Sequence, residues 1–417
     1  MGVSSKREWI GATSRRQRPA INCLACSAKS GLVSILADSR VLFAYARFPC
    51  RGALMLRFVL LGSALASFLL TVGAHGQKAT AAPVPAPNEG DFILHNFHFK
   101  SGETLPELRM HYFTFGKLAK DAKGRTTNVV LILHGTGGSG RQFLAAQFAG
   151  VLFGPGQLLD VNRYFVILPD NIGHGQSSKP SDGLRMHFPQ YDYDDMVAAQ
   201  RELLEKGLAI NHLRLIIGTS IGCMHSWVWG ETYPDFMDAL MPLACLPVQI
   251  AGRNRVWRKM IIEGIRQDPG WKNGNYTTEP RAALQISADF LLIAGSAPLV
   301  MQKNLPTRDE ADTYLDDYVQ RVTADLDAND FLYAVSASRN YDPSPGLEKI
   351  TASVMFINSA DDFINPPELG IAEREIKKVK TGSFVLLPIA GQTHGHGTHT
   401  DAAVWQQYLK ELLDTGH

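Results

Sequence analysis

The sequence predicts an α/β fold in which helices flank an open, mostly parallel sheet. From about residue 91 onward, short and continuous apolar runs of strand length recur, as expected for parallel strands that are covered on both faces. Amphipathic stretches of helical length separate these runs, and this alternation is typical of parallel sheets. The interval between Cys245 and Ile350 carries helical periodicity and no convincing strand, which indicates a helical insertion.

Six strands and four helices are predicted in chain order. The strands are Asn128–Leu133, Tyr164–Leu168, Leu213–Ile217, Ala239–Ala244, Ala352–Ile357 and Ser383–Leu387. The helices are Asp192–Leu208, Gly222–Tyr233, Pro367–Val379 and Asp401–Leu413. Residues 91–247 and 351–417 would form the core. Residues 248–350 would form a helical cap over the carboxyl edge of the sheet, where open α/β sheets bind ligands.

Composition excludes several classes of protein. The 417 residues are 45% hydrophobic and 19% charged, which is ordinary for a globular protein. Lys and Arg number 41 against 40 Asp and Glu, so no global field exists to attract nucleic acid. Five cysteines in this length make neither a disulfide scaffold nor a zinc framework. An enzyme with no nucleic-acid partner is expected.

The N-terminal part differs from the rest. Residues 1–54 hold nine Lys and Arg but only two acids, and we predict a mis-assigned upstream extension, with translation starting at Met55. An Arg-rich transit peptide and an uncleaved anchor are the alternatives. The apolar run Phe58–Val72 has the length of a signal-peptide core and is short for a membrane span. We therefore predict a signal peptide over residues 55–82, a linker over 83–90, and an exported protein without stable membrane insertion.

A candidate nucleophile follows the predicted strand Leu213–Ile217. The sequence Gly218-Thr219-Ser220-Ile221-Gly222 leads directly into a helix. In this strand–turn–helix context, G-x-S-x-G is a nucleophile elbow, which raises the serine hydroxyl at a helix N-terminus. The alternative is a Gly-Ser turn that only caps the helix.

A glycine-rich turn, His134 to Gly140, follows the strand Asn128–Leu133. Such a turn lets a backbone N–H approach a tetrahedral oxyanion, together with the N–H that follows the nucleophile. We assign these donors to Thr136 and Ile221, with Gly137 as the alternative to Thr136. A phosphate-binding loop is excluded because no Gly-Lys-Ser/Thr follows.

An acid and a base come after the next two strands. Asp361 and Asp362 follow Ala352–Ile357, and we choose Asp362 to orient the base. A histidine-rich loop follows Ser383–Leu387. The chain order Ser, Asp, His is that of α/β-hydrolases. The three histidines of the loop also suggest a metal site, but a triad already accounts for one of them, so we expect neither metal nor cofactor. They are His394, His396 and His399.

Several segments resemble the homoserine O-acetyltransferase family of α/β-hydrolase-fold proteins. They begin with FPQYDYDDMVAAQRELLEKGLAINHLRLIIGTSIGCMHSWVWGETYPDFMDALMPLAC, and continue with NRVWRKMIIEGIRQDPGWKNGNY and DANDFLYAVSASRNYD. The resemblance covers roughly residues 91–415. It implies an α/β-hydrolase fold with an inserted helical cap and the triad Ser220, Asp362 and His396. The histidine follows from the preceding Gly395, because family members place a glycine before the catalytic histidine.

The sequence also departs from true homoserine acetyltransferases. It has Cys223 where they carry a second glycine after the elbow, and His225 where they carry a glutamine. The loop from Asp170 to Pro180 looks like that of general α/β-hydrolases, and no pocket arginine for an amino-acid carboxylate can be placed. We therefore predict a serine esterase acting on a small-molecule ester. The alternative is an O-acyltransferase with an acyl-CoA donor, and a silent binding protein is disfavoured by the intact triad. A homodimer is left open.

Some neighbouring residues are expected to have structural roles. Cys223 is predicted to be a buried thiol, with a disulfide to Cys245 as the less favoured alternative. His174 and His225 are predicted to pack locally rather than to line the pocket. The acids around Asp192 are predicted to cap a helix.

Overall fold

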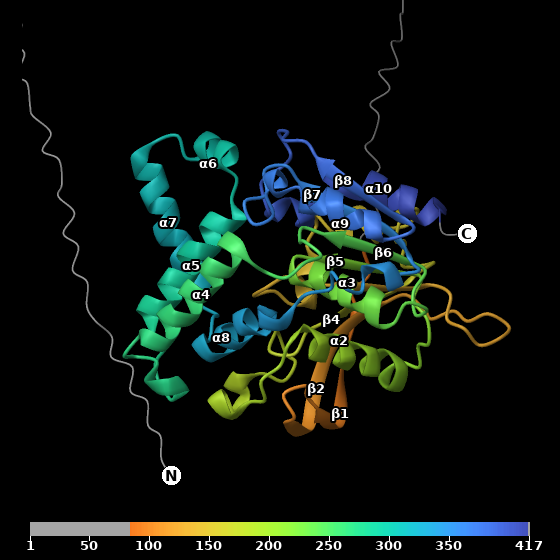
Figure 1. Ribbon diagram of the computed structural model, residues 1–417, viewed down its shortest axis with the longest axis horizontal. Coiled ribbons are helices and arrows are strands. Elements are labelled where there is room, and N and C mark those ends of the chain that lie inside the picture. Colours follow the sequence, from red (N-terminus) through yellow and green to blue (C-terminus); the bar gives the residue numbers. More distant parts are fainter. Residues whose placement is uncertain (1–83, 416–417) are drawn as a thin grey trace, which may run out of the picture. The chain divides into compact units, whose positions relative to one another are not determined.

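The computed structural model describes residues 84–415. Its centre is an eight-stranded sheet in the order β1-β2-β4-β3-β5-β6-β7-β8, in which β1 and β2 are antiparallel and the other six strands are parallel to one another (Figure 1). The strands are β1 (Asn88–His98), β2 (Thr104–Phe115), β3 (Val129–Leu133), β4 (Phe165–Pro169), β5 (Leu215–Thr219), β6 (Ala239–Leu243), β7 (Ser353–Ser359) and β8 (Gly382–Leu387). The predicted α/β class with a mostly parallel sheet is confirmed.

The six predicted strands correspond to β3–β8, and the antiparallel pair β1–β2 was missed. In β2 the buried side chains of Leu108 and Met110 alternate with exposed or half-buried ones, unlike the continuous apolar runs of the parallel strands. Because β1 begins at Asn88, the predicted linker over 83–90 is wrong at its C-terminal end. The predicted extension over 1–54 and the signal peptide over 55–82 lie outside the described residues.

Each face of the sheet supports its own apolar core. In β3, Val129 and Leu131 point to one face and Val130 and Ile132 to the other, as the two-residue repeat of a strand requires. The first face packs against α2 (Tyr193–Glu202), α3 (Ile221–Thr232) and α9 (Ile371–Glu375). The second packs against α1 (Ala149–Leu152) and α10 (Ala402–Thr415). Helices on both faces explain why the parallel strands are apolar throughout.

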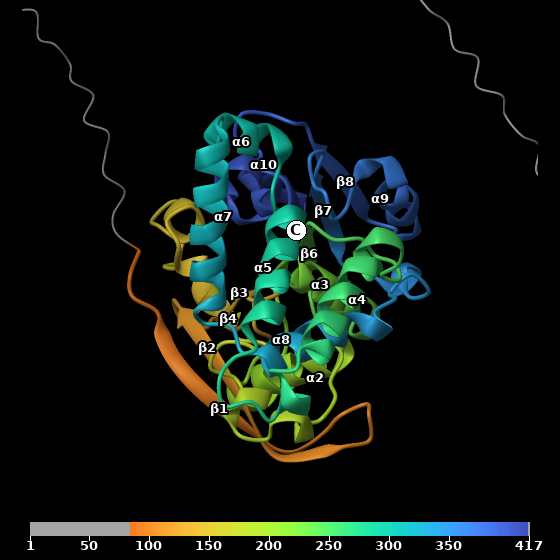
Figure 2. The same cartoon turned by 90° about the vertical axis from the view of Figure 1, so that its left-hand side faces the viewer.

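Between β6 and β7, every regular element of the structure is helical. The long elements are α4 (Gly252–Gln267), α5 (Arg281–Gly295), α6 (Pro298–Asn304), α7 (Arg308–Thr323) and α8 (Ala328–Ser336). A separate apolar core joins α4, α5 and α8 through side chains such as Ile265, Leu284 and Phe331. These helices lie to one side of the sheet in Figure 1, and Figure 2 shows them from that side, in front of the strands. The predicted limits of the cap, 248–350, stay a prediction.

Two predicted helices differ from the observed ones. Asp192 caps α2 as expected, because its carboxylate accepts from the amides of Asp194 and Asp195, and the helix ends in a wider turn over Leu203–Gly207. The predicted helix Pro367–Val379 is broken into short turns around α9. Gly370 causes the break, since its φ of 59° is left-handed and cannot continue a right-handed helix.

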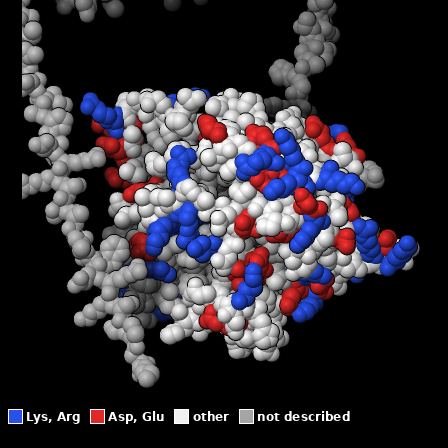
Figure 3. Space-filling view, in the orientation of Figure 1, with Lys and Arg blue, Asp and Glu red and all other residues white. Residues whose placement is uncertain are grey.

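Among the described residues, acids outnumber bases, with 38 Asp and Glu against 30 Lys and Arg. Figure 3 shows basic and acidic side chains interspersed on the visible face. Within residues 84–415, no single helix is long and apolar enough to cross a membrane; α5 and α6 would meet the length and composition only together, with a 104° bend between them.

Candidate active site

Ser220 occupies a sharp turn between β5 and α3. Its backbone has φ 55° and ψ −112°, a conformation that residues other than glycine rarely adopt. The amide of Ser220 donates to the carbonyl of Leu243 at 2.9 Å, which ties the turn to the end of β6. The turn places the hydroxyl at the N-terminus of α3, where backbone amides and the helix dipole favour negative charge.

The glycines on either side of Ser220 are required by close backbone approach. A Cβ at Gly218 would lie 2.0 Å from the carbonyl oxygen of Gly222. A Cβ at Gly222 would lie 2.1 Å from the carbonyl oxygen of Leu133, at the end of β3. The first turn of α3 therefore fits against β3 only without side chains.

Gly222→Ala is expected to destabilise the protein by about 1–3 kcal/mol, because the added methyl must displace the β3 backbone. Gly264→Ala is the control, since this glycine lies inside α4 and its added methyl would find no atom closer than 3.9 Å. That control should gain about 0.5–1 kcal/mol through helix propensity. Urea unfolding of both variants would measure the difference, and a neutral Gly222→Ala would contradict the close approach.

The structure brings together the three residues predicted to act as nucleophile, base and acid. Ser220 Oγ lies 3.0 Å from His396 Nε2, and His396 Nδ1 lies 2.9 Å from Asp362 Oδ2. They follow β5, β8 and β7, so the parallel order of the sheet delivers all three to one edge. Asp362 and His396 are buried, at 2% and 8% exposure, while Ser220 is partly open. The catalytic roles of these residues stay predictions.

Asp362 is held as an anion by its surroundings. Its Oδ1 accepts from the amides of Ile364 and Asn365, and the side chain of Asn365 donates to Oδ2 at 2.9 Å. Burial alone would raise the pKa of this carboxyl, but His396 and these hydrogen bonds outweigh it and lower the pKa below its usual value. The rival, Asp361, faces another way and accepts from the hydroxyl of Ser359.

The other two histidines of the loop make different contacts. His394 Nδ1 lies 3.3 Å from the carbonyl of Gln392, and its ring does not line the cavity at Ser220. His399 contacts the carbonyl of His396, and burial together with the nearby His396 lowers its pKa to about 3. No cluster of three or more His, Cys, Asp or Glu in the described part of the chain is placed to hold a metal ion.

The predicted oxyanion donors lie on both sides of Ser220. Ile221 is the first residue of α3, so its amide has no carbonyl partner within the helix. Thr136 lines the same cavity as Ser220, whereas the alternative, Gly137, does not. Both assignments stay predictions.

A buried histidine that sequence reasoning did not single out fixes the glycine-rich loop. His134 is fully buried; its Nδ1 lies 2.9 Å from the carbonyl of Gly135, and its Nε2 accepts from the amide of Asn171. Burial lowers the pKa of His134 to about 4, so the ring is neutral at pH 7 and can donate at one nitrogen while accepting at the other. His134 thereby positions the backbone next to Thr136.

The cap closes a cavity over Ser220. Its volume is 180 Å³, and α4, α5 and α8 supply much of its wall, including Trp257, Phe290 and Phe331. Arg258 also lines it, at 8% exposure, with Nε donating to Asn254 at 2.8 Å. The sequence alone could not place this arginine at the site, because the cap has no motif that fixes which side of α4 faces the sheet.

Expectations for three further residues had mixed outcomes. The prediction that Cys223 is a buried free thiol is wrong, since a disulfide joins it to Cys245 with the Cα atoms 5.9 Å apart. The reason is geometric, because α3 packs directly on β6 and brings the two residues together. His174 and His225 are buried and do not line the cavity at Ser220. His225 instead lies against Tyr193 and accepts from Gln200, and burial lowers its pKa well below the usual value.

Known proteins resemble this chain in both sequence and structure. The model of the alpha/beta hydrolase fold family matches residues 128–385. A homoserine O-acetyltransferase of Moorella thermoacetica is 31% identical over 363 residues, which is 76% of this chain and 94% of that protein.

Two solved structures share the fold. The homoserine O-acetyltransferase of Bacillus anthracis superposes with a TM-score of 0.69 at 22% identity, covering 80% of this chain and 99% of that one. An acetylester hydrolase of Corynebacterium glutamicum also superposes with a TM-score of 0.69, at 19% identity, and the match covers 79% of this chain and 96% of that one. The chain therefore belongs to the α/β-hydrolase fold family, in its homoserine O-acetyltransferase-like group.

Proposed function

We propose that the protein is a serine hydrolase that cleaves small acyl esters through Ser220, His396 and Asp362. The observation that carries the proposal is the continuous chain of contacts, 3.0 Å from Ser220 Oγ to His396 Nε2 and 2.9 Å from His396 Nδ1 to Asp362 Oδ2. It runs from a partly open hydroxyl to a buried carboxylate, as nucleophilic catalysis by serine needs.

The proposed reaction has two halves. Ser220 Oγ attacks the ester carbonyl while His396 Nε2 takes its proton, and the oxyanion accepts from the amides of Ile221 and Thr136. His396 then gives the proton to the departing alcohol, which leaves an acyl group on Ser220. Water enters, His396 takes a proton from it, and hydrolysis of the acyl-enzyme frees the acid and restores Ser220. Asp362 holds Nδ1 of His396 and stabilises the imidazolium formed in each half.

An O-acyltransferase is the second candidate, favoured by the 31% identical homoserine O-acetyltransferase. The same residues would form the acyl-enzyme from an acyl thioester, and an alcohol in place of water would accept the acyl group. Arg258, buried in the cavity wall, is the group that could attract an anionic acceptor.

Product analysis separates the two functions. The purified protein is incubated with p-nitrophenyl acetate, and separately with acetyl-CoA in the presence and absence of homoserine. A hydrolase releases acetate from the ester without an acceptor, whereas a transferase forms O-acetylhomoserine and releases CoA mainly when homoserine is present. Acetyl transfer faster than ester hydrolysis would refute the leading proposal.

We also propose that the protein is exported. The apolar run Phe58–Val72 supports this, and so does the Cys223–Cys245 disulfide, because disulfides persist mainly in oxidising compartments. Acetyl-CoA is a cytosolic donor, so export favours water as the acceptor. N-terminal sequencing of the secreted protein should find a start between Gln77 and Asp91, and a start at Met1 would contradict export by this signal.

A further inference from the structure

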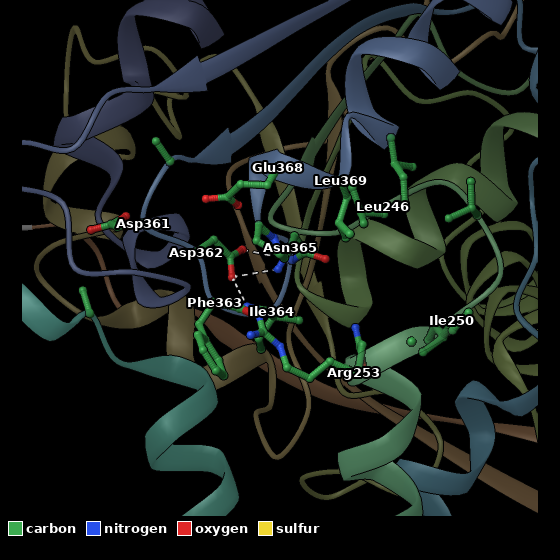
Figure 4. A pocket seen from close by; sticks show the side chains of 18 of the residues that line it. Leu246, Ile250, Arg253, Asp361, Asp362, Phe363, Ile364, Asn365, Glu368 and Leu369 are labelled. Carbon is green, nitrogen blue, oxygen red and sulfur yellow. Dashed lines mark hydrogen bonds between the residues drawn. The ribbon is translucent and has the colours of Figure 1, made fainter.

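A second and larger cavity lies beside the one at Ser220. Its volume is 680 Å³, and its wall is largely apolar (Figure 4). Side chains that line it come from the loop after β6, from α6, and from the loops after β7 and β8: Leu246, Ile250, Leu299, Leu369 and Ile389. Polar side chains also lie among them: Gln249, Arg253, Asn254, Asp361, Asp362, Asn365 and Glu368.

A thin wall separates the two cavities. Met224, one turn after Ser220, and Ile364, two residues after Asp362, line both of them. Beside them, Trp257 of the small cavity stacks on Phe363 of the large one, with ring centroids 6.3 Å apart. The two cavities therefore adjoin, and a substrate that occupied both would have to pass between Met224 and Ile364.

Arg253 strengthens this wall. Its guanidinium lies 3.7 Å from the centroid of Phe363 and donates to the carbonyl of the same residue at 2.5 Å. These contacts of Arg253 fasten α4 to the loop after β7.

The larger cavity lies on the side of His396 and Asp362. Residues 360–366, which carry Asp362, form part of its wall, and so do Ala297 and Leu299. The segment before α6 packs on the histidine loop, since a Cβ at Gly395 would lie 3.2 Å from the amide of Ala297. The residues of the glycine-rich oxyanion loop do not line this cavity.

We infer that the larger cavity binds the alcohol part of the ester, and that this alcohol is apolar; the inference rests on the function proposed above. In serine ester hydrolysis, the histidine that takes the serine proton passes it to the departing alcohol, so that alcohol lies on the histidine side. The smaller cavity, only 180 Å³ in volume and walled in part by the cap, then holds a short acyl group. The substrate class is thus a short-chain acyl ester of an apolar alcohol.

The side chains around the mouth of the cavity also favour an apolar ligand. Leu299, Leu369 and Ile389 line it and are 66%, 51% and 53% exposed. Large apolar side chains gathered around one opening are typical of binding sites for apolar groups, because each is costly to leave in water.

Two matched ester series test the inference. In the first, the acyl group is always acetyl and the alcohol lengthens from ethanol to hexanol. In the second, the alcohol is always ethanol and the acid lengthens from acetate to octanoate. We expect kcat/KM to rise by about fourfold per added methylene in the alcohol series, the factor for burying one methylene group. It should fall along the acid series.

A double variant and a control test whether the dependence of kcat/KM on alcohol length arises at the larger cavity. Leu299→Glu with Ile389→Glu places two charges at the mouth, and should lower the ratio of kcat/KM for hexyl acetate to that for ethyl acetate at least tenfold. Ile293→Glu is the control, because this residue of α5 is 61% exposed and lines neither cavity. Its ratio should match that of the parent, and thermal unfolding would verify that all variants are folded.

The outcomes are distinct. Equal kcat/KM for ethyl and hexyl acetate, or an unchanged ratio in the double variant, would overturn the alcohol site while esterase activity remains. A rise along the acid series that the double variant abolishes would assign the cavity to the acyl group instead. No hydrolysis of any ester above that of Ser220→Ala would refute the proposed function itself.

Discussion

Replacing Ser220 with alanine is expected to lower kcat for ester hydrolysis by roughly 10⁶-fold, the scale of loss seen when the serine of a triad is removed. The reason is that Ser220 Oγ, at 3.0 Å, is the hydroxyl that contacts His396 Nε2. The loss should appear in kcat, because the alanine variant retains both cavities and still binds the ester. Single-turnover release of p-nitrophenol, with circular dichroism to check the fold, measures it.

The same experiment includes a test of cooperation. His396→Ala should cost about as much as Ser220→Ala, because the hydroxyl is a weak nucleophile without its base. The double variant should be scarcely worse than either single one, since the two residues act as a unit. His394→Ala is the control and should keep most activity, as its ring contacts Gln392 and not Ser220. If Ser220→Ala remained active, the acyl-enzyme mechanism would have to be abandoned.

The predictable parts of the fold are the strands whose side chains are apolar on both faces. β3–β7 are buried on both faces and the edge strand β8 is apolar too, so all six appear as continuous apolar runs, and their order along the chain then implies a parallel sheet. β1 and β2 form the antiparallel edge, where the exposed Glu107 and the half-buried Arg109 alternate with the buried Leu108 and Met110. This short alternation of polar and apolar residues does not distinguish a strand from an irregular segment, and the two strands were therefore missed.

The candidate site likewise has features that the sequence predicts and features that it does not. Ser220 was predictable because its turn requires glycines at fixed positions, and that requirement appears in the local sequence. The disulfide was not, because the distance between Cys223 and Cys245 depends on how α3 packs on β6. The two cavities were also beyond prediction, since Trp257 and Phe363 become neighbours only when the cap docks on the sheet.

Asp362→Asn is expected to lower kcat by roughly 10⁴-fold, less than the loss of the nucleophile. The asparagine amide can replace the shape of the carboxylate but not its charge, so it cannot stabilise the imidazolium. It can also present an N–H to His396 Nδ1, which would select the tautomer with Nε2 protonated and unable to accept the proton of Ser220.

The neighbouring aspartate provides the matched control. Asp361→Asn changes the same charge one residue away, at a carboxylate that contacts Ser359 rather than His396, and should keep activity within a few-fold of the parent. Both variants would be compared by kcat with p-nitrophenyl acetate between pH 6 and 9. An inactive Asp361→Asn beside an active Asp362→Asn would reverse the assignment of the acid and leave Ser220 and His396 in place. The 2.9 Å contact between Asp362 and His396, together with the hydrogen bonds that keep this carboxyl ionised, favours the opposite result.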